Sequence, residues 1–150
     1  MLSTENIQVI DCGTGDDAFR LDSISATPYP PRSGENVTVE AVGTVLKPIK
    51  EGAFVIVTVK LGLIKVLNRK VDICEQVKES RDLECPLPEG EYTVKEEIHI
   101  PGVAPMGKYT IQARGFMSDD SEDVDLGCLD LKVQMLPARP GHFLASSRPS

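Results

Sequence analysis

Apolar and polar residues alternate along several short segments of this chain. A period of two places every second side chain on the same face of a strand, so each segment is expected to bury one face. The inward sets are Val37, Val39, Ala41 and Val45 in 37–45, Tyr92, Val94, Ile98 and Ile100 in 92–100, Tyr109, Ile111 and Ala113 in 108–117, and Leu129, Leu131, Val133 and Met135 in 129–135.

The longest apolar run, 53–67, is expected to form one strand. Its odd positions share a face, while Phe54 and Ile56 lie on the other, so we expect its first half to be covered on both sides. Gly62 indicates a bulge, after which Ile64 and Val66 turn inward.

Two further short strands are expected at 8–12 and 19–25. The many strands and the lack of a 3.6-residue period predict an all-β fold, an antiparallel sandwich of two sheets. The stretch 75–84 is expected to be a loop, and 137–150, which has no periodicity, a disordered tail.

Four cysteines, Cys12, Cys74, Cys85 and Cys128, indicate a disulfide framework, because the chain has no Cys-x-x-Cys motif for a metal. Four cysteines allow three pairings. A bridge between Cys74 and Cys85 would close a short loop, and the remaining pair would join the first segment to the last. Disulfides favour an oxidising compartment. Met1 to Ile10 lack the pattern of a signal peptide, so we expect that Met1 replaces a removed leader.

The net charge of −7 and the lack of Lys/Arg clusters argue against a nucleic-acid partner. The chain has no Gly-x-Ser-x-Gly motif, and we expect that the protein is not an enzyme and binds no cofactor. The acidic segment 119–125 is expected to be a solvated hairpin loop and not a metal site, because Val124 stands where a calcium loop needs glycine. Asn36, followed by Val37 and Thr38, forms an N-glycosylation sequon.

Several motifs together resemble the ML lipid-recognition family. They are Asp11-Cys12-Gly13, Thr27-Pro28-Tyr29-Pro30, Val71-Asp72-Ile73-Cys74, Asp82 to Leu87, Ile100 to Tyr109 and Cys128-Leu129-Asp130-Leu131. The resemblance implies one domain over 1–136 with an immunoglobulin-like sandwich that holds a lipid cavity between its sheets. It also implies the bridges Cys12–Cys128 and Cys74–Cys85. Animal members carry a third disulfide near 27–33, where this chain has no cysteine.

In particular, the chain resembles fungal phosphatidylglycerol/phosphatidylinositol transfer proteins, relatives of the second Niemann-Pick type C protein. This implies a carrier that moves one phospholipid between membranes. The alternatives are a sterol carrier and a lipid-recognition or receptor-accessory module without transfer activity. We expect a monomer with transient membrane contact, in the secretory lumen, in a vacuole or late endosome, or secreted. A membrane receptor that accepts the lipid is a candidate partner.

By this resemblance the mouth of the cavity lies between 66–70 and 101–107. The candidate mouth residues are Ile64, Val66, Val103, Pro105, Met106 and Tyr109, and the candidate deeper residues are Val57, Val59, Ile98, Ile111, Ala113 and Val133. Ordinary core packing is the alternative role for the deeper set. Three cations, Lys65, Arg69 and Lys70, are either head-group contacts or solubilising charges.

Overall fold

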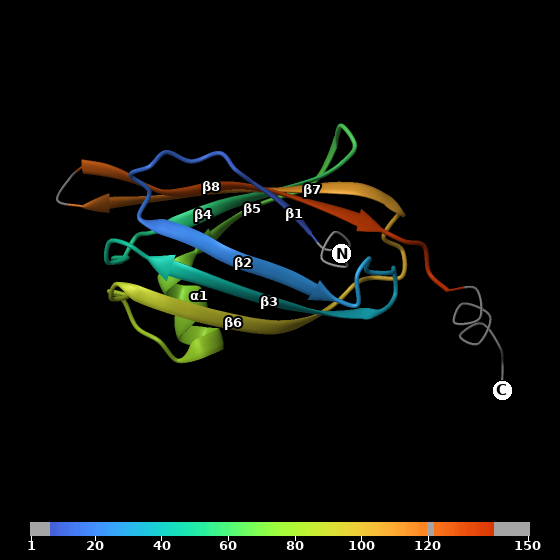
Figure 1. Ribbon diagram of the computed structural model, residues 1–150, viewed down its shortest axis with the longest axis horizontal. Helices are drawn as coiled ribbons and strands as arrows, with labels where there is room; N and C mark the ends of the chain where they lie inside the picture. The colour runs from blue at the N-terminus through green and yellow to red at the C-terminus, as the bar shows by residue number, and fades with distance from the viewer. Residues whose placement is uncertain (1–6, 120–121, 140–150) are drawn as a thin grey trace.

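Two antiparallel sheets face each other in the computed structural model, which describes residues 7–119 and 122–139 (Figure 1). One sheet has the strand order β1-β8-β7-β4-β5, and the other has the order β2-β3-β6. The strands are β1 (Gln8–Asp11), β2 (Phe19–Thr27), β3 (Asn36–Val45), β4 (Phe54–Leu61), β5 (Ile64–Asp72), β6 (Gly90–His99), β7 (Gly107–Asp119) and β8 (Glu122–Met135). The predicted antiparallel sandwich is therefore confirmed.

The run 53–67 is not one strand. β4 ends at Leu61, and β5 begins at Ile64 and returns antiparallel to it. Gly62 occupies this tight turn with φ 61°, a conformation that glycine adopts without a steric penalty. The expected bulge at Gly62 is thus a hairpin turn, and the register shift lies within β4 before this turn, between Val59 and Lys60. On the outer face Phe54 is covered by the Phe116 ring and by the ammonium of Lys70.

A helix replaces the loop that was expected over 75–84. It is α1 (Ile73–Arg81), which begins where the carboxylate of Asp72 accepts the Glu75 N–H and ends at Asp82 in the left-handed conformation. Lys78 and Arg81 lie in its last turn, where cations stabilise the helix dipole. The prediction missed this helix because nine residues are too few to show a clear helical period.

The β7–β8 hairpin is longer than predicted. β8 begins at Glu122, so Asp123 and Asp125 belong to a strand and not to the expected loop 119–125. Residues 120 and 121, at its centre, lie outside the described part of the chain. A register shift beside Gly115 adds one residue to β8, and both Leu126 and Gly127 then face the sandwich interior.

The buried core is divided between the two ends of the sandwich. The larger cluster contains Ala18, Val45, Ile49, Ala53, Leu87, Met117 and Leu126. The smaller cluster contains Ala26, Val37 and Ile100, which lie where β3 begins and β6 ends. The register pairs Val45 with Gly90 at one end and Asn36 with His99 at the other, so the two clusters are separated along the length of these strands.

Both expected disulfides are present. Cys12 is bonded to Cys128, which ties β1 to β8, and Cys74 is bonded to Cys85, which ties α1 to the segment after it. The region 27–33, where this chain has no third disulfide, is held by hydrogen bonds. The Gln134 N–H donates to the Tyr29 hydroxyl over 3.0 Å, and Ser33 donates to the Ala104 carbonyl over 2.6 Å.

The C-terminal segment begins after the Leu136 bridge to Arg32. Arg139 forms an ion pair with Glu35 over 2.6 Å. The rest of the predicted tail, 140–150, lies outside the described residues, as does Met1. Within the described residues, no helix is long and apolar enough to cross a bilayer.

Candidate functional site

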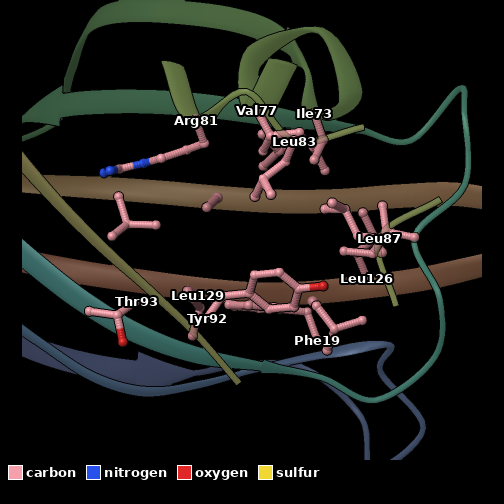
Figure 2. Close-up of a pocket in the computed structure, with 17 residues that line it drawn as sticks. Phe19, Ile73, Val77, Arg81, Leu83, Leu87, Tyr92, Thr93, Leu126 and Leu129 are labelled. Atoms are coloured by element: carbon pink, nitrogen blue, oxygen red, sulfur yellow. The ribbon is translucent and has the colours of Figure 1, made fainter. Parts of the chain in front are cut away.

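A cavity of about 320 Å³ lies between the two sheets beside α1 (Figure 2). Most of its wall is aliphatic or aromatic, and it draws on both sheets, on α1 and on the loops beside the helix. The lining residues are Phe19, Val45, Ile49, Val55, Ile73, Val77, Arg81, Leu83, Leu87, Tyr92, Thr93, Val94, Ala113, Gly115, Leu126, Gly127 and Leu129.

Small residues on the inward face of the five-stranded sheet create this space. Ala113 and Gly115 alternate along β7, and Gly127 lies opposite Gly115 on β8. Cross-strand partners share a face, so these three positions together leave a region without long side chains. A larger residue at this place would fill the gap between the sheets.

The helix covers the cavity with one face. Ile73, Val77 and Arg81 are spaced by four residues, so their side chains lie along the same side of α1, and all three line the cavity. Figure 2 shows Ile73 and Val77 above the space and Tyr92, Phe19 and Leu129 below it.

Two aromatic side chains on the opposite wall present carbon atoms to the cavity. The Tyr92 hydroxyl donates to the Pro88 carbonyl over 2.7 Å, which satisfies its polar atom. Phe19 lies over Gly43, where any Cβ atom would overlap its ring. The wall therefore offers few hydrogen-bonding groups, as expected of a site for an apolar ligand.

The cavity opens between α1 and the edge strand β6. Leu83 and Val94 line it and are nevertheless 37% and 40% exposed. Arg81 lies at the same edge, and Figure 2 shows its nitrogen atoms at the end of the pocket away from Leu87. The Arg81 Nη2 donates to the Lys95 carbonyl over 3.1 Å and to the Glu96 carboxylate over 2.9 Å.

The inward faces stay accessible beyond the cavity. Ile98 shares a face with Val94 on β6, and it is 48% exposed. On β5, Leu67 is paired with Val59, which faces the interior of the sandwich from β4. Leu67 therefore lies on the inward face as well, and it is exposed. The edges β5 and β6 are thus not packed together over this length.

Of the candidate lipid-binding residues, Ala113 lines the cavity. Val57, Val59, Ile111 and Val133 are half-buried, and alternation places them on the inward face of the same sheet. Val57 is paired with Ala113 at the edge of the cavity, and the other three lie farther toward the opposite end. The structure therefore brings these residues onto one surface with Ile98 facing it from β6, but not into the cavity beside α1.

The candidate mouth residues lie in two segments at the end of the sandwich away from the cavity. Ile64 and Val66 belong to the start of β5, and Val103, Pro105 and Met106 to the β6–β7 loop, and all five are exposed. The Gly62 N–H donates to the Lys108 carbonyl over 3.3 Å, which joins the β4–β5 turn to the start of β7. We call Leu63, Ile64, Val103 and Met106 the apolar tip.

Tyr109 lies beside this tip. Its hydroxyl donates to the Pro105 carbonyl over 2.6 Å, which holds the loop against β7. Burial raises the pKa of the Tyr109 phenol above its ordinary value. Tyr109 is therefore a neutral hydrogen-bond donor at physiological pH.

The three candidate head-group cations lie on β5. Lys70 contacts the outer-face Phe54 ring, with its Nζ 4.3 Å from the ring centroid. Arg69 is paired with Val57 and so shares the inward face, whereas Lys65 is paired with Lys60. None of the three lines the cavity beside α1.

Two other candidate features are placed by the structure. Asn36 is exposed at the first position of β3, and its Oδ1 lies 2.7 Å from His99 Nδ1. Glu51, Cys74 and Cys85 come together with metal-ligand spacing, but both sulfur atoms are in a disulfide and are not thiolate ligands.

Sequence reasoning missed the helix face, Phe19, Leu83 and Leu87. The spacing of Ile73, Val77 and Arg81 by four residues was a signal of the helix face, although too short a one to establish a helical period. The small residues Ala113, Gly115 and Gly127 were a second signal, since they share one inward surface.

The comparison with protein families agrees with this architecture. The model of the ML domain matches residues 6–135. The chain belongs to the ML-domain family. It is 43% identical over 135 residues to a phosphatidylglycerol/phosphatidylinositol transfer protein of Cryptococcus neoformans, and the match covers 89% of this chain and 73% of that protein. A Mycosarcoma maydis protein of the same name is 45% identical over 124 residues, with 82% of this chain and 63% of that protein covered.

A solved ML-type structure shows the same fold. The Niemann-Pick type C2 protein from Japanese carpenter ant superposes with a TM-score of 0.58 at 16% identity, and the match covers 85% of this chain and 98% of that one. The sandwich of this ML domain is thus the same fold as that of a protein with only 16% sequence identity.

Proposed function

We propose that this ML domain is a lipid-transfer protein that binds one phospholipid, of the phosphatidylglycerol or phosphatidylinositol type, and moves it between membranes. The observation that carries the proposal is the apolar cavity between the sheets. Its relatives at 43% and 45% identity are named as transfer proteins for these two lipids.

The size of the cavity defines how a phospholipid would bind. Its volume of about 320 Å³ is near the lower limit of ~300–1,000 Å³ for small-molecule sites, so it accommodates part of one ligand and not two whole acyl chains. The remaining tail would lie against the accessible inward residues Leu67 and Ile98. Burial of tail carbons there would gain about 25 cal/mol per Å².

The apolar tip is the proposed membrane contact. Leu63 is 100% exposed and Val103 is 90% exposed, and neither contributes to the buried core. Isolated apolar side chains on loops insert into the interfacial region of a bilayer, where their transfer from water is favourable. The tip is small and the chain carries a net charge of −7, so the contact would be transient.

The compartment and the assembly belong to the same proposal. Two disulfides suit the lumen of the secretory pathway, a vacuole or late endosome, or the exterior. The carrier would act as a monomer and would deliver its lipid to a membrane or to a membrane receptor. No catalytic role is proposed.

Two measurements test the function. Organic extraction of the purified protein, followed by mass spectrometry, should recover phosphatidylglycerol or phosphatidylinositol. Transfer of fluorescent analogues between vesicles should be faster for these two lipids than for a fluorescent sterol. Recovery of sterol with sterol transfer alone would replace the proposal by a sterol carrier, and binding without transfer would replace it by a lipid-recognition module.

A further inference from the structure

Arg81 differs from all the other described residues that line the cavity, because it alone carries a charge. It is the last residue of α1 and lies at the opening, beside the exposed Leu83 and Val94. A charged group is costly in an apolar site unless it has partners. The position of Arg81 therefore calls for a specific interaction.

The guanidinium of Arg81 is only partly satisfied. Its Nη2 donates to the Lys95 carbonyl and to the Glu96 carboxylate, 3.1 and 2.9 Å away. Its Nε is buried, and none of the described residues accepts a hydrogen bond from it. The Arg81 side chain is nevertheless 30% exposed, so a ligand oxygen at the opening would reach its accessible N–H groups and not the buried Nε, and a charge-assisted hydrogen bond there would be favourable.

The ligand geometry follows from the cavity. An amphiphile with its tail between the sheets places its head group at the opening, where Arg81 lies. A guanidinium presents its N–H groups as a planar fork that matches the oxygen atoms of a phosphate or a carboxylate. Glu96 already occupies part of this fork, and so it competes with a bound anion.

We propose that Arg81 is a specificity-determining residue that binds the anionic oxygen atoms of the lipid head group, so that the carrier selects anionic amphiphiles over uncharged ones. This inference rests on the proposed lipid-transfer function and deepens it. Phospholipid phosphate and fatty-acid carboxylate share the required chemistry. The experiment separates these two sources.

The test compares three ligands of matched chain length, phosphatidylglycerol, diacylglycerol and a free fatty acid, by equilibrium binding. Diacylglycerol has the same tails as phosphatidylglycerol but no anionic group. In Arg81→Gln, the ratio of phosphatidylglycerol to diacylglycerol affinity should fall about tenfold, which corresponds to about 1.4 kcal/mol. Arg81→Lys should give an affinity ratio between those of Arg81→Gln and the original protein, because lysine keeps the positive charge but lacks the planar set of N–H donors.

Arg114→Gln is the matched control. Arg114 is also ion-paired, with Asp130 over 3.1 Å, and it is not a lining residue. Its substitution changes the net charge equally, so it should leave the affinity ratio within about twofold of the original value.

Glu96→Gln separates head-group binding from a purely structural role of the ion pair. If Glu96 competes with the ligand, its removal should raise the phosphatidylglycerol affinity by roughly two- to fivefold. If Arg81 and Glu96 only fasten α1 to β6, both variants should lose affinity for all three ligands alike, and the proposal is then wrong.

Failure of this inference differs from failure of the proposed function. If the original protein transfers phosphatidylglycerol and Arg81→Gln leaves the ratio of phosphatidylglycerol to diacylglycerol affinity unchanged, the proposed function holds and the proposed role of Arg81 is wrong. If the original protein does not transfer phospholipid but binds fatty acid in a way that depends on Arg81, the proposed function is wrong. Arg81 then still binds the anionic group of the ligand, which is a carboxylate.

Discussion

The disulfide between Cys74 and Cys85 joins the first turn of α1 to the chain beyond its end, with a Cα–Cα distance of 5.7 Å. The helix and the segment that contains Leu83 thus form a closed loop on one wall of the cavity, and Leu87, which also lines the cavity, follows this loop. This bridge holds the wall in place where the two sheets alone would leave it open.

Loss of this bridge should weaken both the fold and ligand binding. Cys74→Ala with Cys85→Ala should reduce the free energy of unfolding by about 2–3 kcal/mol, since the sequence separation is 11 residues. Denaturant unfolding and lipid binding measure the two effects. Cys12→Ala with Cys128→Ala is the control, because it should cost about 4–5 kcal/mol but leave α1 bridged. If the two double variants lose lipid affinity equally under conditions in which the same fraction of each is folded, the α1 bridge has no specific role in binding.

A bulky residue at Ala113 should occupy the space of the ligand. Ala113→Phe should lower lipid affinity about tenfold or more while changing the free energy of unfolding by less than about 1 kcal/mol, because the ring enters an existing cavity. Ala53→Phe is the matched control. Ala53 is fully buried and does not line the cavity, so overpacking should cost about 1–3 kcal/mol or more. A strongly destabilised Ala113→Phe protein would show that the space is not available.

The apolar tip should determine association with membranes. Leu63→Asp with Val103→Asp should reduce co-sedimentation with vesicles and lipid transfer several-fold, because the introduced charges oppose insertion. The free energy of unfolding should stay within about 0.5 kcal/mol, as usual for exposed positions. Leu46→Asp, at an exposed site at the opposite end of β3, tests for a general effect of added charge. Equal losses in both proteins would argue against the tip.

The raised pKa of Tyr109 predicts an alkaline loss of stability. Burial raises the pKa of the Tyr109 phenol in the folded state. Its contribution to the free energy of unfolding is therefore fully present below the pKa of the unfolded state, roughly 10, and is lost as the pH rises through the pKa of the folded state. The stability difference between the original protein and Tyr109→Phe should therefore shrink from about pH 8 to pH 11. Unfolding free energies measured at each pH test this, and a constant difference would contradict it.

Much of the sandwich was predictable because alternation is a local property. The odd positions of β3 and the even positions of β6 face inward as the pattern predicted, and Val45 and Tyr92 reach the cavity. The cysteine positions and the family motifs led to both disulfide pairings, which the structure confirms. The short α1 was missed because its sequence gives only two apolar residues, Ile73 and Val77, at helical spacing.

The sequence by itself determined the fold class, the inward faces and the family, since each depends on residue types at fixed spacing. Only the tertiary structure decided where the cavity lies. Alternation identifies Val57 and Ala113 equally as inward, but it does not report which inward side chains meet a partner across the interior. That depends on the separation of the sheets, on the small residues of β7 and β8, and on α1, which brings Arg81 from outside both sheets to the opening.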